Sequence, residues 1–228
     1  MKSKFKISVI TVTKNSESYL QETIDSLSKQ TYQDFEHIII DGASTDRTLD
    51  IIKKNSNKIS KWISEPDLGL YYAMNKGLNF CTGEIIGILN SDDIYFPDAL
   101  SIVNKYFIKN EIDFLFGSVV KHKLMHGFHP KKILWTFGFY TAHSVGFFIK
   151  KNSQQKIGPY NTKYKWSADY DLFYKMIIKF KLNGTATKVD EILGKFRTGG
   201  LSSRIKYLDF LIENNKIRLN NGQNFILV

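Results

Sequence analysis

The apolar run Ile85-Ile86-Gly87-Ile88-Leu89 stops abruptly at Asn90-Ser91-Asp92-Asp93. Consecutive β-branched and aliphatic residues predict a strand that is buried on both faces, as in a parallel sheet. Ligands gather where such strands end, and carboxylates there suit a hard cation, Mg²⁺ or Mn²⁺, that bridges to phosphates. A second interpretation is that Asp92 and Asp93 cap the next helix, since Pro97 fits a first helical turn.

Apolar strands and helical periodicities alternate along the first half of the chain. This β-α alternation predicts a parallel sheet with helices on both faces and ligands at the carboxyl ends of its strands. A Ser18…Gln21 capping pattern marks the first helix. The regularity fades after residue 120. Strands are expected at 5–12, 36–40, 62–63, 85–89, 114–120, 145–149 and 192–196, and helices at 18–30, around 49–52, and at 71–80, 97–109, 170–180 and 204–219.

Bulk composition indicates one globular domain: 228 residues, of which 43% are hydrophobic and 24% charged. Cys81 is the single cysteine, which excludes an internal disulfide framework and favours a reducing compartment. The apolar run at 7–10 is too short for a signal peptide, and no run approaches the roughly 18 apolar residues of a membrane span. We therefore expect a cytoplasmic protein.

The net charge of +10 is unevenly placed. Residues 1–90 hold 11 basic and 11 acidic residues, which leaves 21 of the 32 basic and 11 of the 22 acidic residues in 91–228. Such asymmetry predicts that the second half faces an anionic partner or surface. A merely solvated lysine-rich surface is the alternative interpretation.

Three strand ends in the first half deliver carboxylates: Asp41, Asp67 and the pair Asp92-Asp93. Together with the order of elements, this resembles the GT-A fold of the family 2 glycosyltransferases of bacterial polysaccharide assembly. The resemblance implies an α/β, Rossmann-like, mostly parallel central sheet with helices on both faces. It also implies a single domain over 1–228, with a nucleotide-sugar-binding half at 1–93 and an irregular acceptor-side half at 94–228. The matching segments are residues 9–15, 37–46, 64–77, 90–93, 168–171 and 199–202.

The resemblance implies a nucleotide-sugar donor, with a lean to a UDP-sugar, and Mn²⁺ or Mg²⁺ as cofactor. Asp92 is then the metal ligand on the nucleotide diphosphate. The other implied donor contacts are Thr11 and Thr13 lining the nucleotide cleft, Asp41 on the base, Asp67 near base and ribose, Asp93 near ribose or sugar, and Asn75 and Lys76 near the donor sugar or phosphate. For Lys76 the alternative interpretation is a solvated charge at a helix end.

Family 2 members are expected to transfer sugar with inversion, which requires a base for the acceptor hydroxyl. Asp169 matches the family's base position, whereas Asp171 suits a helix cap or dipole partner. For His143 and Trp166 a purely structural role is the alternative. The remaining expected contacts are His143 on the diphosphate or acceptor, Trp166 stacked on a sugar, and Arg197, Gly199, Gly200 and Ser202 in a loop that closes over phosphate.

The charge asymmetry favours a lipid-linked glycan acceptor and a peripheral place on the anionic inner face of a membrane, where each nearby basic residue is attracted by about 1 kcal/mol. We expect Lys131, Lys132, Lys150 and Lys151 to contribute. Two positions depart from the family pattern: Tyr72 and Asn90 stand where acidic residues are frequent. The lost carboxylates make a catalytically silent nucleotide-sugar-binding module the main alternative.

Other functions have less support in the sequence. A sugar nucleotidyltransferase would need a glycine-rich loop after the first strand, and residues 13–16 contain no glycine. The neutral first half and the lack of a recognised motif argue against a nucleic-acid partner. His122, His126 and His129 have the spacing of a zinc-binding helix face, but Gly127 and Pro130 interrupt it, so a basic acceptor-side loop is favoured.

Overall fold

The computed structural model describes residues 4–135, 144–199 and 206–224. The first half alternates strand and helix as the sequence predicts, because each buried apolar run pairs as a strand and each amphipathic segment covers the sheet. Its elements are β1 (Ile7–Thr13), α1 (Leu20–Ser28), β2 (Phe35–Asp41), α2 (Thr48–Lys54), β3 (Lys61–Ser64), α3 (Leu70–Phe80) and β4 (Ile85–Ile88).

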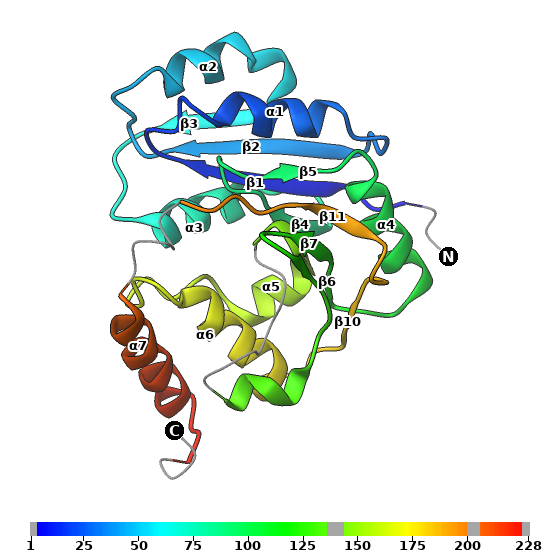
Figure 1. The fold of residues 1–228 in the computed structure, drawn as a ribbon, viewed down its shortest axis with the longest axis vertical. Coiled ribbons are helices and arrows are strands. Elements are labelled where there is room, and N and C mark those ends of the chain that lie inside the picture. Colours follow the sequence, from blue (N-terminus) through cyan, green and yellow to red (C-terminus); the bar gives the residue numbers. More distant parts are fainter. Residues whose placement is uncertain (1–3, 136–143, 200–205, 225–228) are drawn as a thin grey trace.

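The second half supplies the remaining strands of the central sheet, the strands of a second, smaller sheet, and the helices in the lower part of Figure 1. Among the described residues its elements are β5 (Ile94–Tyr95), α4 (Ala99–Lys109), β6 (Phe114–Phe116), β7 (Ser118–Val120), β8 (Leu124–Met125), β9 (Phe147–Lys150), α5 (Lys151–Ile157), α6 (Ala168–Tyr174), β10 (Gly184–Ala186), β11 (Ile192–Lys195) and α7 (Tyr207–Asn220), with 3₁₀ turns at Ser56–Lys58, Pro130–Leu134 and Ser144–Gly146 and a π-helical turn at Lys175–Lys179.

A seven-stranded sheet in the order β10-β6-β9-β4-β1-β2-β3 forms the centre of the fold. β1 pairs in parallel with β2 and β4, and β2 with β3, whereas β9 runs antiparallel to both of its neighbours. In Figure 1, α1 and α2 lie above these strands and α3 lies below them. The mostly parallel α/β sheet with helices on both faces is confirmed.

Alternation along β2 shows how one strand serves both helical layers. Ile39 packs with Leu20 and Ile24 of α1. Its neighbours Ile38 and Ile40 belong to the core on the other side, which includes residues of α3. The β2 residues Ile38, Ile39 and Ile40 are each at most 1% exposed. This double burial explains why the sequence shows a continuous apolar run there.

The predicted single strand at 114–120 is wrong, because the chain changes sheets at Gly117. β6 belongs to the central sheet, and β7 belongs to a second sheet in the order β5-β11-β7-β8. A Cβ at Gly117 would lie 2.0 Å from a side-chain carbon of Leu193, so the close crossing requires glycine. The strand predicted at 145–149 begins only at Phe147, after a 3₁₀ turn.

Two helix starts also differ from the prediction. α1 begins at Leu20, and no side chain caps it, so the Ser18…Gln21 capping box is not formed. α6 begins at Ala168 and runs into the π-helical turn. No helix among the described residues is long and apolar enough to cross a membrane.

His37 is a buried residue of β2 and makes the fold sensitive to mild acid. Its Nε2 lies 2.9 Å from Thr11 Oγ1, and complete burial lowers its pKa from 6.5 to about 3. Below pH 6.5 the unfolded chain therefore binds a proton at this histidine that the folded chain does not bind. The free energy of unfolding decreases as the pH is lowered from 6.5 to 3. From pH 7 to pH 5 this histidine should cost about 2 kcal/mol of unfolding free energy.

Urea unfolding of the wild type and of His37→Gln at both pH values measures this effect. The substitution should remove most of the decrease in unfolding free energy between pH 7 and pH 5. Glu36 does not interfere, because hydrogen bonds from Ser8 and Thr82 outweigh its burial and lower its pKa from 4.5 to about 2, so its contribution disappears only below pH 4.5. An equal loss in His37→Gln would assign the acid sensitivity to other groups.

Candidate active site

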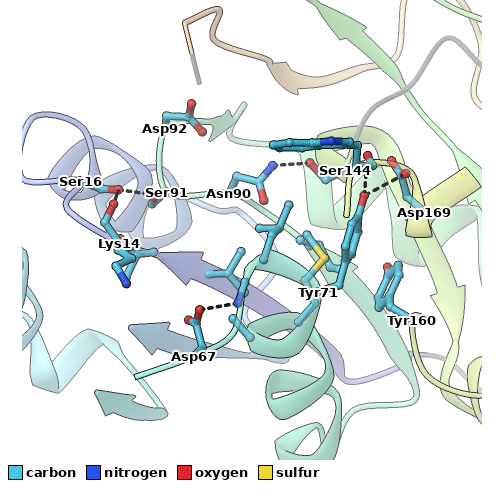
Figure 2. A pocket seen from close by; sticks show the side chains of 18 of the residues that line it. Lys14, Ser16, Asp67, Tyr71, Asn90, Ser91, Asp92, Ser144, Tyr160 and Asp169 are labelled. Atoms are coloured by element: carbon cyan, nitrogen blue, oxygen red, sulfur yellow. Dashed lines mark hydrogen bonds between the residues drawn. The ribbon is translucent and has the colours of Figure 1, made fainter. Parts of the chain in front are cut away.

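A cleft of about 870 Å³ opens at the carboxyl ends of β1 and β4 (Figure 2). Its walls come from segments that are distant in sequence but meet at this edge of the sheet, as expected for an open α/β fold. The lining segments are residues 12–16 at and just after the end of β1, 67–71 and 73–74 around the start of α3, and 90–92 after β4, together with Ser18, Tyr19, Ile88, Ser144, Phe147, Tyr160, Lys165, Trp166, Asp169, Phe173, Phe196, Thr198 and Gly199.

The two strand ends at the floor of the cleft carry polar atoms that no residue satisfies. Ser16 Oγ and Ser91 Oγ lie 2.8 Å apart and join the β1 and β4 ends. Thr13 Oγ1 and Asn90 Oδ1 are buried without a hydrogen-bond partner in the described part of the chain. An unsatisfied buried polar atom costs about 1–3 kcal/mol, so a polar partner at these two atoms, a ligand or an ordered water, would stabilise the strand ends.

The adjacent carboxylates of Asp92 and Asp93 point to different surroundings. Asp92 is half-buried and lines the cleft. Asp93 is fully buried, is absent from the cleft lining, and accepts a hydrogen bond from the Arg197 N–H at 2.9 Å. Burial raises the pKa of Asp92, and burial together with the charge of Asp92 raises the pKa of Asp93 to about 8. A cation at Asp92 would relieve this repulsion.

The other two strand-end carboxylates, Asp41 and Asp67, also have different surroundings. Asp41 is fully buried at the end of β2, where Ser44 donates from its backbone N–H at 3.0 Å and Ser64 from its hydroxyl at 2.6 Å. Asp67 is half-buried and lines the cleft, and its Oδ1 accepts the Gly69 N–H at 2.9 Å. A Cβ at position 42 would lie 2.6 Å from Asp67 Oδ2, so Gly42 leaves room for that carboxylate.

On the opposite wall, Asp169 lies in the first turn of α6 beside Tyr71 of α3. The Tyr71 hydroxyl lies 3.2 Å from Asp169 Oδ1 and 3.0 Å from the Trp166 carbonyl oxygen, so its one proton is shared between them. Figure 2 shows the Tyr71 side chain reaching up to Asp169 on this wall. The Tyr160 ring stacks on Tyr71 with centroids 5.7 Å apart. These contacts fix one carboxylate oxygen of Asp169.

The family model for glycosyl transferase family 2 matches residues 8–177. The chain belongs to this family. An uncharacterized glycosyltransferase of Methanocaldococcus jannaschii is 31% identical over 221 residues, covering 89% of this chain and 73% of the relative. A PGL/p-HBAD biosynthesis glycosyltransferase of Mycobacterium tuberculosis is 32% identical over 173 residues, covering 72% of this chain. This family 2 chain spans 66% of that relative's length.

Solved structures share the fold of this family 2 chain. The mannosyltransferase PcManGT of Pyrobaculum calidifontis, in complex with GDP-Man and Mn²⁺, superposes with a TM-score of 0.75 at 19% identity, covering 99% of this chain and 67% of that chain. Residues 1–349 of S. aureus TarS, in complex with UDP, give a TM-score of 0.73 at 21% identity, covering 94% of this chain and 66% of that chain. The predicted GT-A fold is thereby confirmed.

Besides Asp41 and Asp93, four residues expected to contact the donor lie outside the cleft lining of the family 2 domain. Thr11 is bonded to His37. Asn75 holds the Tyr160 backbone, with its amide donating to the carbonyl at 2.9 Å and its oxygen accepting the N–H at 2.8 Å. Lys76 forms an ion pair with Glu65 at 2.8 Å. The Arg197 guanidinium forms an ion pair with Glu22 at 2.6 Å and lies over the Tyr19 ring.

The two acidic residues of α6 take different places. Asp171 is buried, pairs with Lys175 at 2.6 Å and accepts the Asn221 amide at 2.9 Å. This agrees with the structural interpretation of Asp171. His143, Gly200 and Ser202 lie outside the described residues, so their expected contacts stay predictions.

The three spaced histidines do not form a helix face. His126 Nδ1 lies 2.7 Å from the Ser118 hydroxyl, and His129 directly precedes a 3₁₀ turn. In the described part of the chain no group of three or more His, Cys, Asp or Glu side chains is placed to hold a metal ion.

Sequence inspection missed the residues that hold the Asp169 wall in place. Tyr71 lies inside a matching segment that assigns it no role, although a tyrosine at the second residue of a helix beside a strand-end cleft is a usable signal. Glu213 of α7 gave no signal. Its carboxylate accepts the backbone N–H groups of Lys165, Trp166 and Ser167, each at 2.7 Å, from a position far along the chain.

Proposed function

We propose that this chain transfers a sugar from a nucleotide-sugar, most consistent with a UDP-sugar, to a hydroxyl group of a glycan acceptor. One observation carries the proposal: a single cleft combines unsatisfied polar atoms at the β1 and β4 ends with Asp92 on one side and Asp169 on the other. The neighbours crystallised with UDP and with GDP-Man and Mn²⁺ share the fold and support a nucleotide-sugar donor.

The donor is proposed to bind at the β1 and β4 ends. Thr13 offers the hydroxyl that lacks a partner, and Asp67 offers its free acceptor positions to base or ribose. Asp41 already has three donors from Ser44 and Ser64, so we assign it to shaping this end of the cleft. By the same argument Thr11, Asn75 and Lys76 support neighbouring groups, and Asp93 holds the loop at Arg197.

Asp92 is the proposed ligand of Mn²⁺ or Mg²⁺. A hard cation that keeps several waters needs only one or two carboxylates, which fits the single cleft-lining aspartate at the β4 end, whose burial disfavours its charge. Such an ion would supply positive charge for the leaving diphosphate. The fully buried Asp93 would keep the Asp92 segment in place through its bond to the Arg197 N–H.

Asp169 is the proposed general base of an inverting transfer. As the acceptor oxygen attacks the anomeric carbon, its proton passes to Asp169, and the bond from that carbon to the nucleoside diphosphate breaks on the opposite face. Because Tyr71 lies against Oδ1, the carboxylate is held in one orientation toward the cleft. Trp166, which also lines the cleft, offers an aromatic face to a sugar.

A thermal-shift screen of nucleoside diphosphates, each with and without Mn²⁺, tests the donor assignment. A ligand at 100 times its dissociation constant stabilises the fold by about 2.7 kcal/mol, which corresponds to roughly 5–10 °C for a chain of this size. UDP with Mn²⁺ should give the largest shift. Equal melting temperatures with every nucleotide would contradict nucleotide binding in this cleft.

The acceptor is proposed to be a lipid-linked glycan for a surface polysaccharide, met at the anionic inner face of a membrane. Lys131 and Lys132 are exposed on a 3₁₀ turn of the basic half. Lys151 is excluded from this role, because its ammonium group donates to the Cys81 carbonyl at 2.7 Å, and Lys150 is half-buried.

Liposome co-sedimentation tests the membrane part. Binding should rise with the fraction of anionic lipid and fall with salt. Charge reversal at Lys131 and Lys132 should reduce binding at least tenfold, since each lysine contributes about 1 kcal/mol and reversal doubles the change. The matched control reverses Lys53 and Lys54, which are exposed on α2 in the neutral half. Equal partitioning onto neutral and anionic vesicles would leave the lysines as solvated surface.

A further inference from the structure

A second hollow of about 450 Å³ lies beside the cleft, between the start of α3 and the segment before α6. We call it the side groove. It shares Leu68–Tyr71, Lys165 and Trp166 with the cleft, so these residues form the wall between the two spaces. Tyr72, Thr162 and Tyr164 line the side groove alone. The donor and base assignments above use none of these three.

The chemistry of the side groove combines flat apolar surfaces with hydrogen-bonding groups. Leu68 is 83% exposed and Tyr72 is 37% exposed, both unusually open for large apolar side chains. Trp166 is half-buried, and the Lys165 ammonium lies 4.6 Å from its ring centre. Hydroxyls and an ammonium at the edge of aromatic faces are typical of sites that bind sugar rings, which present both C–H faces and hydroxyls.

The wall of the side groove is rigid. Glu213 of α7 accepts three consecutive backbone N–H groups from Lys165 to Ser167. The Tyr164 hydroxyl accepts the side-chain amide of Asn220, also on α7. A preformed wall of this kind binds a ligand without the entropic cost of ordering a loop.

The same wall is tied to the proposed base. The Tyr71 hydroxyl lies within hydrogen-bond distance of both the Trp166 carbonyl and Asp169 Oδ1. Because Tyr71 also lines the side groove, the groove begins directly beside Asp169. An acceptor whose terminal hydroxyl lies at Asp169 must direct the rest of its chain somewhere. The side groove adjoins the cleft and has aromatic walls.

We propose that the side groove is an acceptor subsite that binds the sugar ring following the one that receives the transferred sugar. This rests on the proposed function and adds the acceptor class, a glycan of at least two sugars. Tyr72 then supplies an aromatic wall of the acceptor site at the position where the sequence pattern often has a carboxylate. The departure at Tyr72 becomes a specificity feature rather than a defect of the donor site.

The test is saturation-transfer NMR with a panel of methyl monosaccharides and the corresponding disaccharides, in the presence of UDP and Mn²⁺. The wild type should bind one or more disaccharides more tightly than its monosaccharide units. Tyr72→Ala should weaken that disaccharide by about 3- to 10-fold, the loss expected for one aromatic contact, whereas Tyr72→Phe should keep most of the affinity. Tyr207→Ala, an exposed tyrosine on α7 outside both spaces, is the matched control.

UDP affinity, measured on the same samples, separates the two proposals. If UDP binds and no disaccharide is preferred over its monosaccharide units, or if Tyr72→Ala binds disaccharides as well as the wild type, the subsite assignment is wrong while the donor site stands. A wild type that does not bind UDP would instead overturn the proposed function on which the subsite rests.

Discussion

Asp169→Asn should lower the turnover of nucleotide-sugar by at least ~100-fold while the affinity for UDP stays nearly unchanged. The amide has the size of the carboxylate but cannot take the proton of the acceptor hydroxyl, and positioned bases contribute about 10²–10⁴-fold. The residues at the β1 and β4 ends that are proposed to bind the nucleotide lie on the other side of the cleft, so their contacts with UDP should not change. Steady-state release of nucleoside diphosphate and calorimetric titration of UDP measure the two quantities.

Asp171→Asn is the matched control for this prediction. Asp171 lies two residues further along α6, and its carboxylate is used by Lys175 and Asn221 rather than by the cleft. Its replacement should lower stability but leave turnover per folded molecule near that of the wild type. Normal turnover in Asp169→Asn, or an equal loss in both variants, would remove Asp169 from the base role.

Asp92→Asn should abolish the increase in UDP affinity that Mn²⁺ produces. A charged contact contributes roughly 1.5–3 kcal/mol, so UDP binding in the presence of Mn²⁺ should weaken by about 10- to 100-fold. Without metal the variant should bind UDP as well as the wild type or slightly better, because a negative charge near the diphosphate has been removed. Isothermal titration with and without Mn²⁺ measures the four affinities.

Asp67→Asn distinguishes the metal from the base and ribose contacts. Asp67 also lines the cleft but belongs to the segment before α3. Its loss should weaken uridine and UDP by a similar factor whether or not Mn²⁺ is present. An Asp92→Asn variant that binds UDP with Mn²⁺ as tightly as the wild type would show that the cation, if it binds, rests on other groups.

The first half of the fold was predictable because its signals are local. A run such as Ile85 to Leu89 can only be a buried strand, and the polar residues at its end must then lie at the edge where parallel strands finish. Asp67 and Asp92 follow strand ends and line the cleft, whereas Thr13 was expected there from the resemblance to family 2. The second half was less predictable, since β6 and β7 separate at Gly117, where Leu193, far along the chain, occupies the space that a Cβ would need.

Several predicted site residues already have a partner distant in sequence that satisfies the side chain. Asn75 sits within a matching segment, yet both ends of its amide bond to Tyr160, 85 residues away. Asp41 meets Ser64, and Arg197 meets Glu22 on α1. A one-dimensional pattern identifies polar residues near the cleft, but it does not tell which of them the fold has already paired.

Release of nucleoside diphosphate from a panel of UDP- and GDP-sugars, with Mn²⁺ and an oligosaccharide acceptor mixture, tests the central claim most directly. The account predicts release from at least one donor, with large losses in both Asp92→Asn and Asp169→Asn and little change in Asp171→Asn. Tight UDP binding with no release from any donor would indicate a silent nucleotide-sugar-binding module. Release that survives in both variants would contradict the catalytic assignment of the cleft.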